Sequence, residues 1–297
     1  MNPQLAFLIG LFIVIVALVL TRRQWAPAAV HAVPSVWRIA KITVAEARRR
    51  RVIQAVVILV VLILISMTFF SYLSPQEQSR MLISGGLAAI TVFGILLAIF
   101  IAAFLIPQEL ESRTVYAILA KPVRRFEFVL GKYVGALIIL AAIVATMTVV
   151  LVGVLMLQDS LVQDLPDSAF NPNLKGVVFA AIMNYFAIAV LTGLIILIST
   201  VASTTMTVIS AFIIWAVGSL QSTISDLAAH AELPVTKALL TVVYLIVPKL
   251  ENFDFRNEVS NFVPISYGTG WEAVIQGIGY TAVVLILASI FFNDRQV

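Results

Sequence analysis

The sequence alternates long apolar runs with short polar segments. Seven runs are long enough, or nearly long enough, to cross a membrane as helices: residues 5–20, 52–72, 81–106, 128–157, 175–198, 206–220 and 271–292. A spanning helix needs about 20 mostly apolar residues. The pattern therefore predicts an all-α, polytopic membrane protein with a core of six spans and one extra N-terminal span.

Composition supports this fold class. Of the 297 residues, 61% are hydrophobic and 11% are charged, and the mean hydropathy is +1.07. Soluble domains carry about a quarter charged residues. The chain has no cysteine, which excludes disulfides and thiolate metal sites.

The apolar runs divide the chain into three parts. Residues 1–34 are predicted to be a transmembrane anchor and linker, with a cleaved signal peptide as the alternative for the run at 5–20. Residues 35–51 are predicted to form an amphipathic helix on the cytoplasmic leaflet, with Trp37 on its apolar face and cations opposite. The alternative is that its last arginines only mark the start of the next span. Residues 52–297 form the six-span domain.

The connections between spans are less regular than the spans. Short turns are expected at 74–80 outside and at 199–205 inside. Residues 221–266 are expected to be external, and their apolar stretch 238–247 is too short to cross unaided. This stretch, within 236–250, is predicted to be re-entrant or interfacial rather than spanning.

Positive charge gives the orientation, because cytoplasmic loops of membrane proteins carry an excess of lysine and arginine. In this topology the N-terminus is outside and the C-terminus is cytoplasmic. Fourteen of the nineteen cations then lie inside, and the other five are Arg80, Lys175, Lys237, Lys249 and Arg256. The asymmetry accounts for the basic character of the chain without a nucleic-acid partner.

The spans lack the residues of several membrane activities. None has a charged residue near its middle, which disfavours proton- or sodium-coupled transport. His31 and His230 fall on opposite sides of the membrane, and no HExxH zinc motif is present. Three polar residues lie within spans and are candidates for a substrate path, although such residues also hydrogen-bond between helices: Asn184, Thr192 and Gln276.

The sequence also lacks the phosphate-binding pattern GxxxxGK[ST]. The chain is therefore predicted not to be an enzyme and to hold no cofactor or metal. Any nucleotide hydrolysis belongs to a separate subunit.

A charged island at 107–135 interrupts the apolar pattern. Pro107 and Pro122 bound a helix at 108–120, which has glutamates in its first turn and Lys121 just beyond its end, as the helix dipole favours. Two spans can be joined by a handful of residues, so this helix indicates a docking surface. The alternative is a helix that simply lies on the membrane.

The island resembles the cytoplasmic signature of ABC-2 type transporter permeases. The resemblance rests on a glutamate-rich start, Thr114 followed by Leu119, the Lys121-Pro122 stop and Phe128-x-x-Gly131-Lys132 at the next span. It is closest to the branch named for permease components of multicopper enzyme maturation. The segment 247–253 also resembles that branch, and the likeness covers residues 35–297; the run at 5–20 is an addition to the usual six spans.

The resemblance implies a half-transporter: two permease subunits, expected to be a homodimer, with a pair of separate ABC ATPase subunits that bind ATP and Mg. Helix 108–120 would be the coupling helix that enters the ATPase. Its implied contacts are Glu109, Glu111, Arg113, Thr114, Tyr116 and Leu119.

The expected location is the cytoplasmic (inner) membrane, with export or movement of an unidentified substrate as the function. The alternative is a non-transporting ABC-2 scaffold that passes mechanical work to an extracytoplasmic partner, or a structural subunit of a larger membrane complex. By polarity and position, the candidate contacts for an extracytoplasmic protein are Glu251, Asn252, Phe253 and Asp254.

Overall fold

The computed structural model describes residues 29–49, 51–66, 75–105, 125–162, 173–230 and 234–294, and within these ranges the chain is helical, with no strand. The helices are α2 (Ala29–Arg48), α3 (Arg51–Ser66), α4 (Pro75–Leu105), α7 (Arg125–Val162), α8 (Leu174–Val201), α9 (Thr204–Ser219), α10 (Gln221–Ala229), α11 (Pro234–Ile246), the 3-10 helix η2 (Leu250–Phe253), α12 (Arg256–Ser260) and α13 (Tyr267–Asp294). The predicted all-α class is confirmed.

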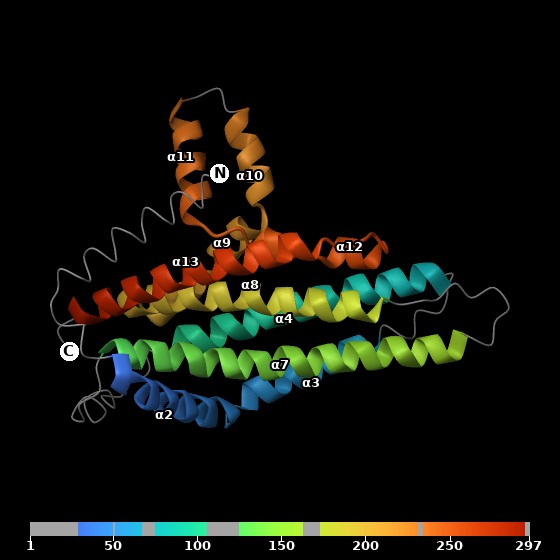
Figure 1. Ribbon diagram of the computed structural model, residues 1–297, viewed down its shortest axis with the longest axis horizontal. Helices are drawn as coiled ribbons and strands as arrows, with labels where there is room; N and C mark the ends of the chain where they lie inside the picture. Colours follow the sequence, from blue (N-terminus) through green and yellow to red (C-terminus); the bar gives the residue numbers. More distant parts are fainter. Residues whose placement is uncertain are drawn as a thin grey trace.

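Four long helices, α4, α7, α8 and α13, run side by side and form the bundle (Figure 1). Helix α8 packs against the other three and supplies much of the buried apolar surface. Its start follows from the sequence, because the Asn173 side chain accepts a hydrogen bond from the Gly176 N–H at 3.0 Å and so caps the helix.

These four helices are long and apolar enough to cross a membrane. Helices α9 and α10 together pass the same test, but they are bent by 68° where they meet, so the described chain offers four or five spans. The described apolar part of α3, Ile53–Ser66, is shorter than a span. The multi-pass character is thus confirmed, while the extra run at 5–20 lies outside the described residues.

Two helix starts differ from the predicted boundaries. The expected external turn at 74–80 is instead helical from Pro75, the first residue of α4, with Glu77 in the first turn. Proline suits the first position of a helix, where its missing N–H has no partner to lose. Helix α2 begins at Ala29, six residues before the predicted start, and includes Pro34.

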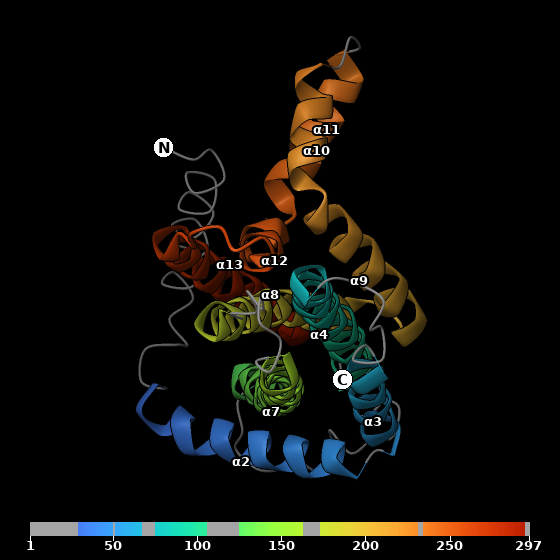
Figure 2. The same cartoon turned by 90° about the vertical axis from the view of Figure 1, so that its right-hand side faces the viewer.

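Helix α2 lies across the start of α7 on the outside of the bundle (Figure 2). The sequence predicts that its apolar face rests on lipid. In the structure Ala40 and Ala47, two residues of that face, are buried, whereas Trp37 is 50% exposed. The small residues of the face thus pack on protein.

Helices α10 and α11 form a hairpin that stands away from the bundle (Figures 1 and 2). Its base is pinned by the buried Gln221, whose amide donates to the carbonyls of Tyr244 and Val247, and by the Tyr280 hydroxyl, which donates to the Ile246 carbonyl at 2.9 Å. The short apolar stretch predicted at 238–247 is therefore mostly one arm of a helical hairpin.

Candidate functional site

The sequence predicts a docking surface for a partner protein in the segment between α4 and α7. Helix α4 ends at Leu105 and α7 begins at Arg125. The predicted coupling helix 108–120 lies outside the described residues, as do its six candidate contacts Glu109, Glu111, Arg113, Thr114, Tyr116 and Leu119. The structure does describe the two helices on either side of this segment, and it defines the contacts of the start of α7.

Two glycines let α2 approach the backbone of α7. A Cβ atom added at Gly131 would lie 2.6 Å from Cβ of Ile39, and one added at Gly135 would lie 2.6 Å from Cβ of Thr43 and 3.1 Å from the Ala40 carbonyl oxygen. Real Cβ atoms do not approach other atoms so closely. The two helices are therefore in contact along a surface that only glycine permits.

A buried lysine lies within the same contact. Lys132 is 1% exposed, and its Nζ is 3.9 Å from Oε2 of Glu46 on α2 and 5.8 Å from the centroid of the Phe128 ring. Burial removes the ammonium from water, so contacts such as these two offset its desolvation, and the lysine is costly to leave without them. We call the set Ile39, Thr43, Glu46, Gly131, Lys132 and Gly135 the α2–α7 junction.

Helix α13 holds the start of α7 from another direction. Phe128 stacks on Phe292, the ring centroids lying 5.5 Å apart with an interplanar angle of 13°, and both side chains are buried. The first turns of α7 are therefore attached to α2 by the junction and to α13 by this stack. A displacement of the start of α7 must move or break one of these contacts.

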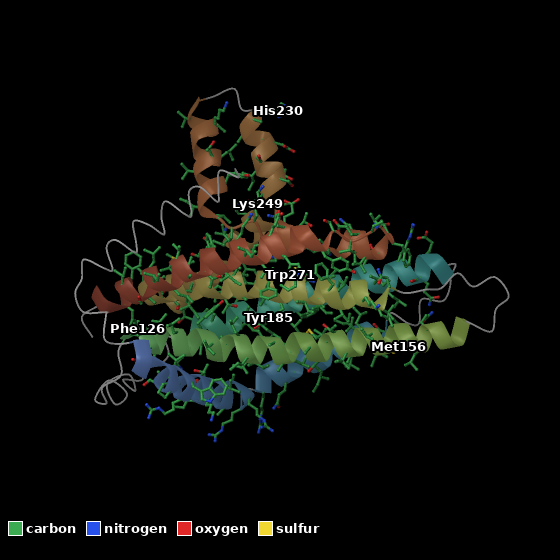
Figure 3. The ribbon with its side chains drawn as sticks, viewed as in Figure 1. Phe126, Met156, Tyr185, His230, Lys249 and Trp271 are labelled. Atoms are coloured by element: carbon green, nitrogen blue, oxygen red, sulfur yellow. The ribbon has the colours of Figure 1, made fainter. Side chains whose placement is uncertain are left out.

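An open apolar groove begins next to the junction. It has a volume of about 490 Å³ and lies between α7, α8 and α13. Phe126, at the start of α7, and Tyr185, farther along the bundle, both line it (Figure 3). Its polar groups are few, and the Tyr133 hydroxyl is occupied by a 3.2 Å hydrogen bond to the Ala189 carbonyl. The groove thus suits an apolar molecule.

The three candidate path residues are not brought together in the groove. Asn184 and Thr192 are buried on α8, and the Thr192 hydroxyl donates to the Ile188 carbonyl of the same helix at 2.7 Å. Gln276 borders a neighbouring cavity of about 30 Å³ next to Lys249, which shares Val190, Phe253 and Gly277 with the groove. Their role in a path stays a prediction.

The four candidate contacts for an extracytoplasmic partner have different surroundings. Phe253 is 3% exposed and therefore offers a partner almost no surface, whereas Asn252 is exposed. The Asp254 carboxylate pairs with Arg256 at 2.7 Å. Glu251 accepts hydrogen bonds from the Ser222 backbone N–H at 3.0 Å and from its hydroxyl at 2.8 Å.

Glu251 therefore caps α10 from a distant part of the chain. We expect Glu251→Ala to weaken the base of the hairpin by about 1 kcal/mol, the usual cost of losing a helix cap. Hydrogen exchange at residues 221–229 measures this, and exchange there should become faster. The exposed neighbour Asn252→Ala should leave it unchanged, and equal effects of the two variants would show that Glu251 is not the cap.

Residues 37–297 match the family model described as ABC-2 family transporter protein. The chain belongs to the ABC-2 transporter family. A search of curated proteins found no significant match. This permease is accordingly a multi-pass membrane subunit of an ABC transporter, and its family implies an ABC ATPase subunit as its partner. In the part of the permease that the structure describes, no three His, Asp or Glu side chains are grouped to hold a metal ion.

The α2–α7 junction was not predicted. Gly131 and Lys132 were assigned to the family signature at the start of a span, although Gly131 and Gly135 form a GxxxG spacing in an apolar helix. That spacing is typical of close helix contacts in membranes. This spacing is the signal in the permease sequence from which the junction could have been predicted.

Proposed function

We propose that the permease couples ATP hydrolysis by a separate pair of ATPase subunits to the movement of a substrate across the cytoplasmic membrane. Mechanical input enters through residues 108–120, between α4 and α7 in the sequence, which the sequence predicts to be a coupling helix. The attachment of the start of α7 to both α2 and α13 is the observation that supports this proposal. Two permease copies form the membrane part, with the end of the bundle at Leu105 and Arg125 facing the cytoplasm.

The contacts at the start of α7 suggest how a displacement becomes a change in the bundle. Packed interfaces tend to switch between discrete arrangements rather than deform continuously. A push on the segment before Arg125 is passed to α2 through the junction and to α13 through Phe128 and Phe292. Since α7 and α13 are two walls of the apolar groove, their relative movement changes its width.

The groove gives the proposal a substrate class. Its walls are almost entirely apolar, so they fit a hydrophobic molecule or the apolar part of a lipid. Asn184, Thr192 and Gln276 remain the candidate polar contacts along the path. We also propose that the permease belongs to the branch named for multicopper enzyme maturation. This resemblance does not imply a copper site in the chain.

The test is a charge reversal in the predicted coupling helix. Arg113→Glu should reduce the ATPase activity of the reconstituted complex by about tenfold or more, because like charges at an interface cost several kcal/mol. Membrane insertion and purified yield should not change. The double variant Glu111→Ala, Tyr116→Ala should give the same separation of insertion from hydrolysis.

Lys175→Glu is the matched control, because Lys175 is exposed at the opposite end of the bundle, at the start of α8. Its ATPase activity should equal that of the unmodified complex. Full transport-linked hydrolysis in the Arg113 variant and in the double variant would disprove the assignment of helix 108–120.

A further inference from the structure

A second groove, outside the bundle, lies where α2, α3 and α7 meet. Its volume is about 640 Å³, and it is lined by Trp37, Lys41, Val44, Ala45, Arg48, Arg49, Gln54 and Ile138. It shares no lining residue with the apolar groove. We propose that it binds one anionic phospholipid, with the phosphate against Lys41, Arg48 and Arg49.

The described lining of this groove carries a positive charge. Three of its eight described residues are cations and none is acidic. Among the residues that the structure describes, Lys41, Arg48 and Arg49 form no ion pair. The nearest acidic side chain along α2, Glu46, is paired with Lys132 of the junction. An anion in the groove would therefore relieve the mutual repulsion of the three cations.

The remaining lining residues distinguish a lipid from a free anion. Val44, Ala45 and Ile138 give the groove apolar surface beside its three cations. Trp37 is half exposed, and Nζ of Lys41 lies 5.5 Å from the centroid of its ring. Tryptophan beside lysine or arginine is typical of the level at which lipid headgroups meet acyl chains. A phosphate ion would use the cations alone, whereas a phospholipid would use both the cations and the apolar surface.

The positions of the groove residues follow from the geometry of α2 and from the break between α2 and α3. Trp37, Lys41 and Arg48 lie on one face of α2, since they are four and seven residues apart. The prediction that the cations lie opposite Trp37 is therefore wrong for Lys41 and Arg48. The Gln54 amide donates to the Arg48 carbonyl at 3.3 Å and so fixes the break between α2 and α3 beside Arg49. A bound lipid would stabilise α2 in its place on α7.

Native mass spectrometry of the purified full chain tests the site. We expect one phosphatidylglycerol to bind more tightly than a phosphatidylcholine with the same acyl chains. Lys41→Gln, Arg48→Gln, Arg49→Gln should weaken this binding roughly a hundredfold, at about fivefold for each cation near a lipid surface. Arg49→Gln alone should weaken it about fivefold, which keeps the test valid if the triple variant does not fold.

The matched control removes three other exposed cations: Arg38→Gln, Lys175→Gln, Lys237→Gln. Arg38 is also on α2, but it donates to the Pro34 carbonyl and does not line the groove. This variant should bind phosphatidylglycerol as the unmodified chain does. Inorganic phosphate and glycerophosphoglycerol test whether the groove binds a free phosphate or a headgroup without acyl chains. Both should displace the lipid only weakly.

Three outcomes would overturn the proposal. They are equal affinity for the anionic and zwitterionic lipids, equal losses in the groove and control variants, or displacement by inorganic phosphate or glycerophosphoglycerol at the concentration of the lipid itself. None of these measurements uses ATPase activity, so the result is independent of the proposed coupling.

Discussion

Gly135→Leu is expected to separate α2 from α7 and to lower the stability of the permease by about 3 kcal/mol, the upper part of the range for overpacked cores. The reason is that a Cβ at Gly135 meets Cβ of Thr43 and the Ala40 carbonyl oxygen, which belong to another helix. A carbonyl on the backbone cannot rotate away as a flexible side chain can. The midpoint of thermal unfolding in detergent, followed by tryptophan fluorescence, should fall. ATPase activity of the reconstituted complex should fall with it, because α7 would no longer be held by α2.

Gly153 supplies the control on the same helix. A Cβ added there has no atom within 4 Å outside the local helix backbone. Leucine is a better helix former than glycine by about 0.8 kcal/mol, so Gly153→Leu should leave stability unchanged or slightly raised. Equal losses in the two variants would mean that the close approach at Gly135 does not matter.

Hydropathy predicted the long helices well, because the requirement behind it is local. Each span must satisfy its own backbone hydrogen bonds in lipid, so an apolar run of sufficient length becomes a helix whatever its neighbours are. Helices α4, α7, α8 and α13 follow this rule. The predicted spans at 81–106, 128–157, 175–198 and 271–292 each lie within or almost within one of them.

The predictions were less accurate where a polar segment was taken to mark the end of a helix. Residues 75–80 are polar, yet they continue α4 outward because Pro75 and Glu77 are favourable residues for its first turn. The bend at Leu220 comes directly after Gly218 and Ser219, a pair at which helices often kink, but this local signal does not give the direction of α10. That direction depends on Gln221, whose amide reaches carbonyls at the end of α11 and just beyond it, more than twenty residues away. A contact so distant in sequence is not visible in a local pattern.

The parts of the candidate site also differ in how far a local sequence pattern could predict them. The helix at 108–120 was predicted from its own prolines and charges, and that prediction lies outside the described residues. The junction beside it depends on a pairing of α2 with α7 that no local rule gives. The GxxxG spacing indicates that a helix should pack closely there, but it does not say which helix is the partner.

Lys132→Glu is expected to be the most damaging charge change at the junction, with a loss of about 3 kcal/mol or more in stability. Lys132 is almost completely buried, so the new carboxylate would be desolvated as the ammonium is now. It would also lie near the Glu46 carboxylate, which is only 3.9 Å from the present Nζ. Thermal unfolding measures the loss. Lys237→Glu on the exposed face of α11 is the control and should have little effect.

Substitutions can separate the effect of the charge of Lys132 from the effect of its size, because its partner Glu46 is much less buried. The Glu46 side chain is 44% exposed, so water can solvate it when the lysine is neutralised. Lys132→Met, which keeps most of the length, should therefore cost far less than Lys132→Glu. Adding Glu46→Lys to Lys132→Glu restores opposite charges and should recover part of the loss. If the methionine variant is as unstable as the glutamate variant, the shape of the lysine matters more than its charge. If the exchanged pair recovers nothing, the contact between Lys132 and Glu46 does not hold α2 on α7.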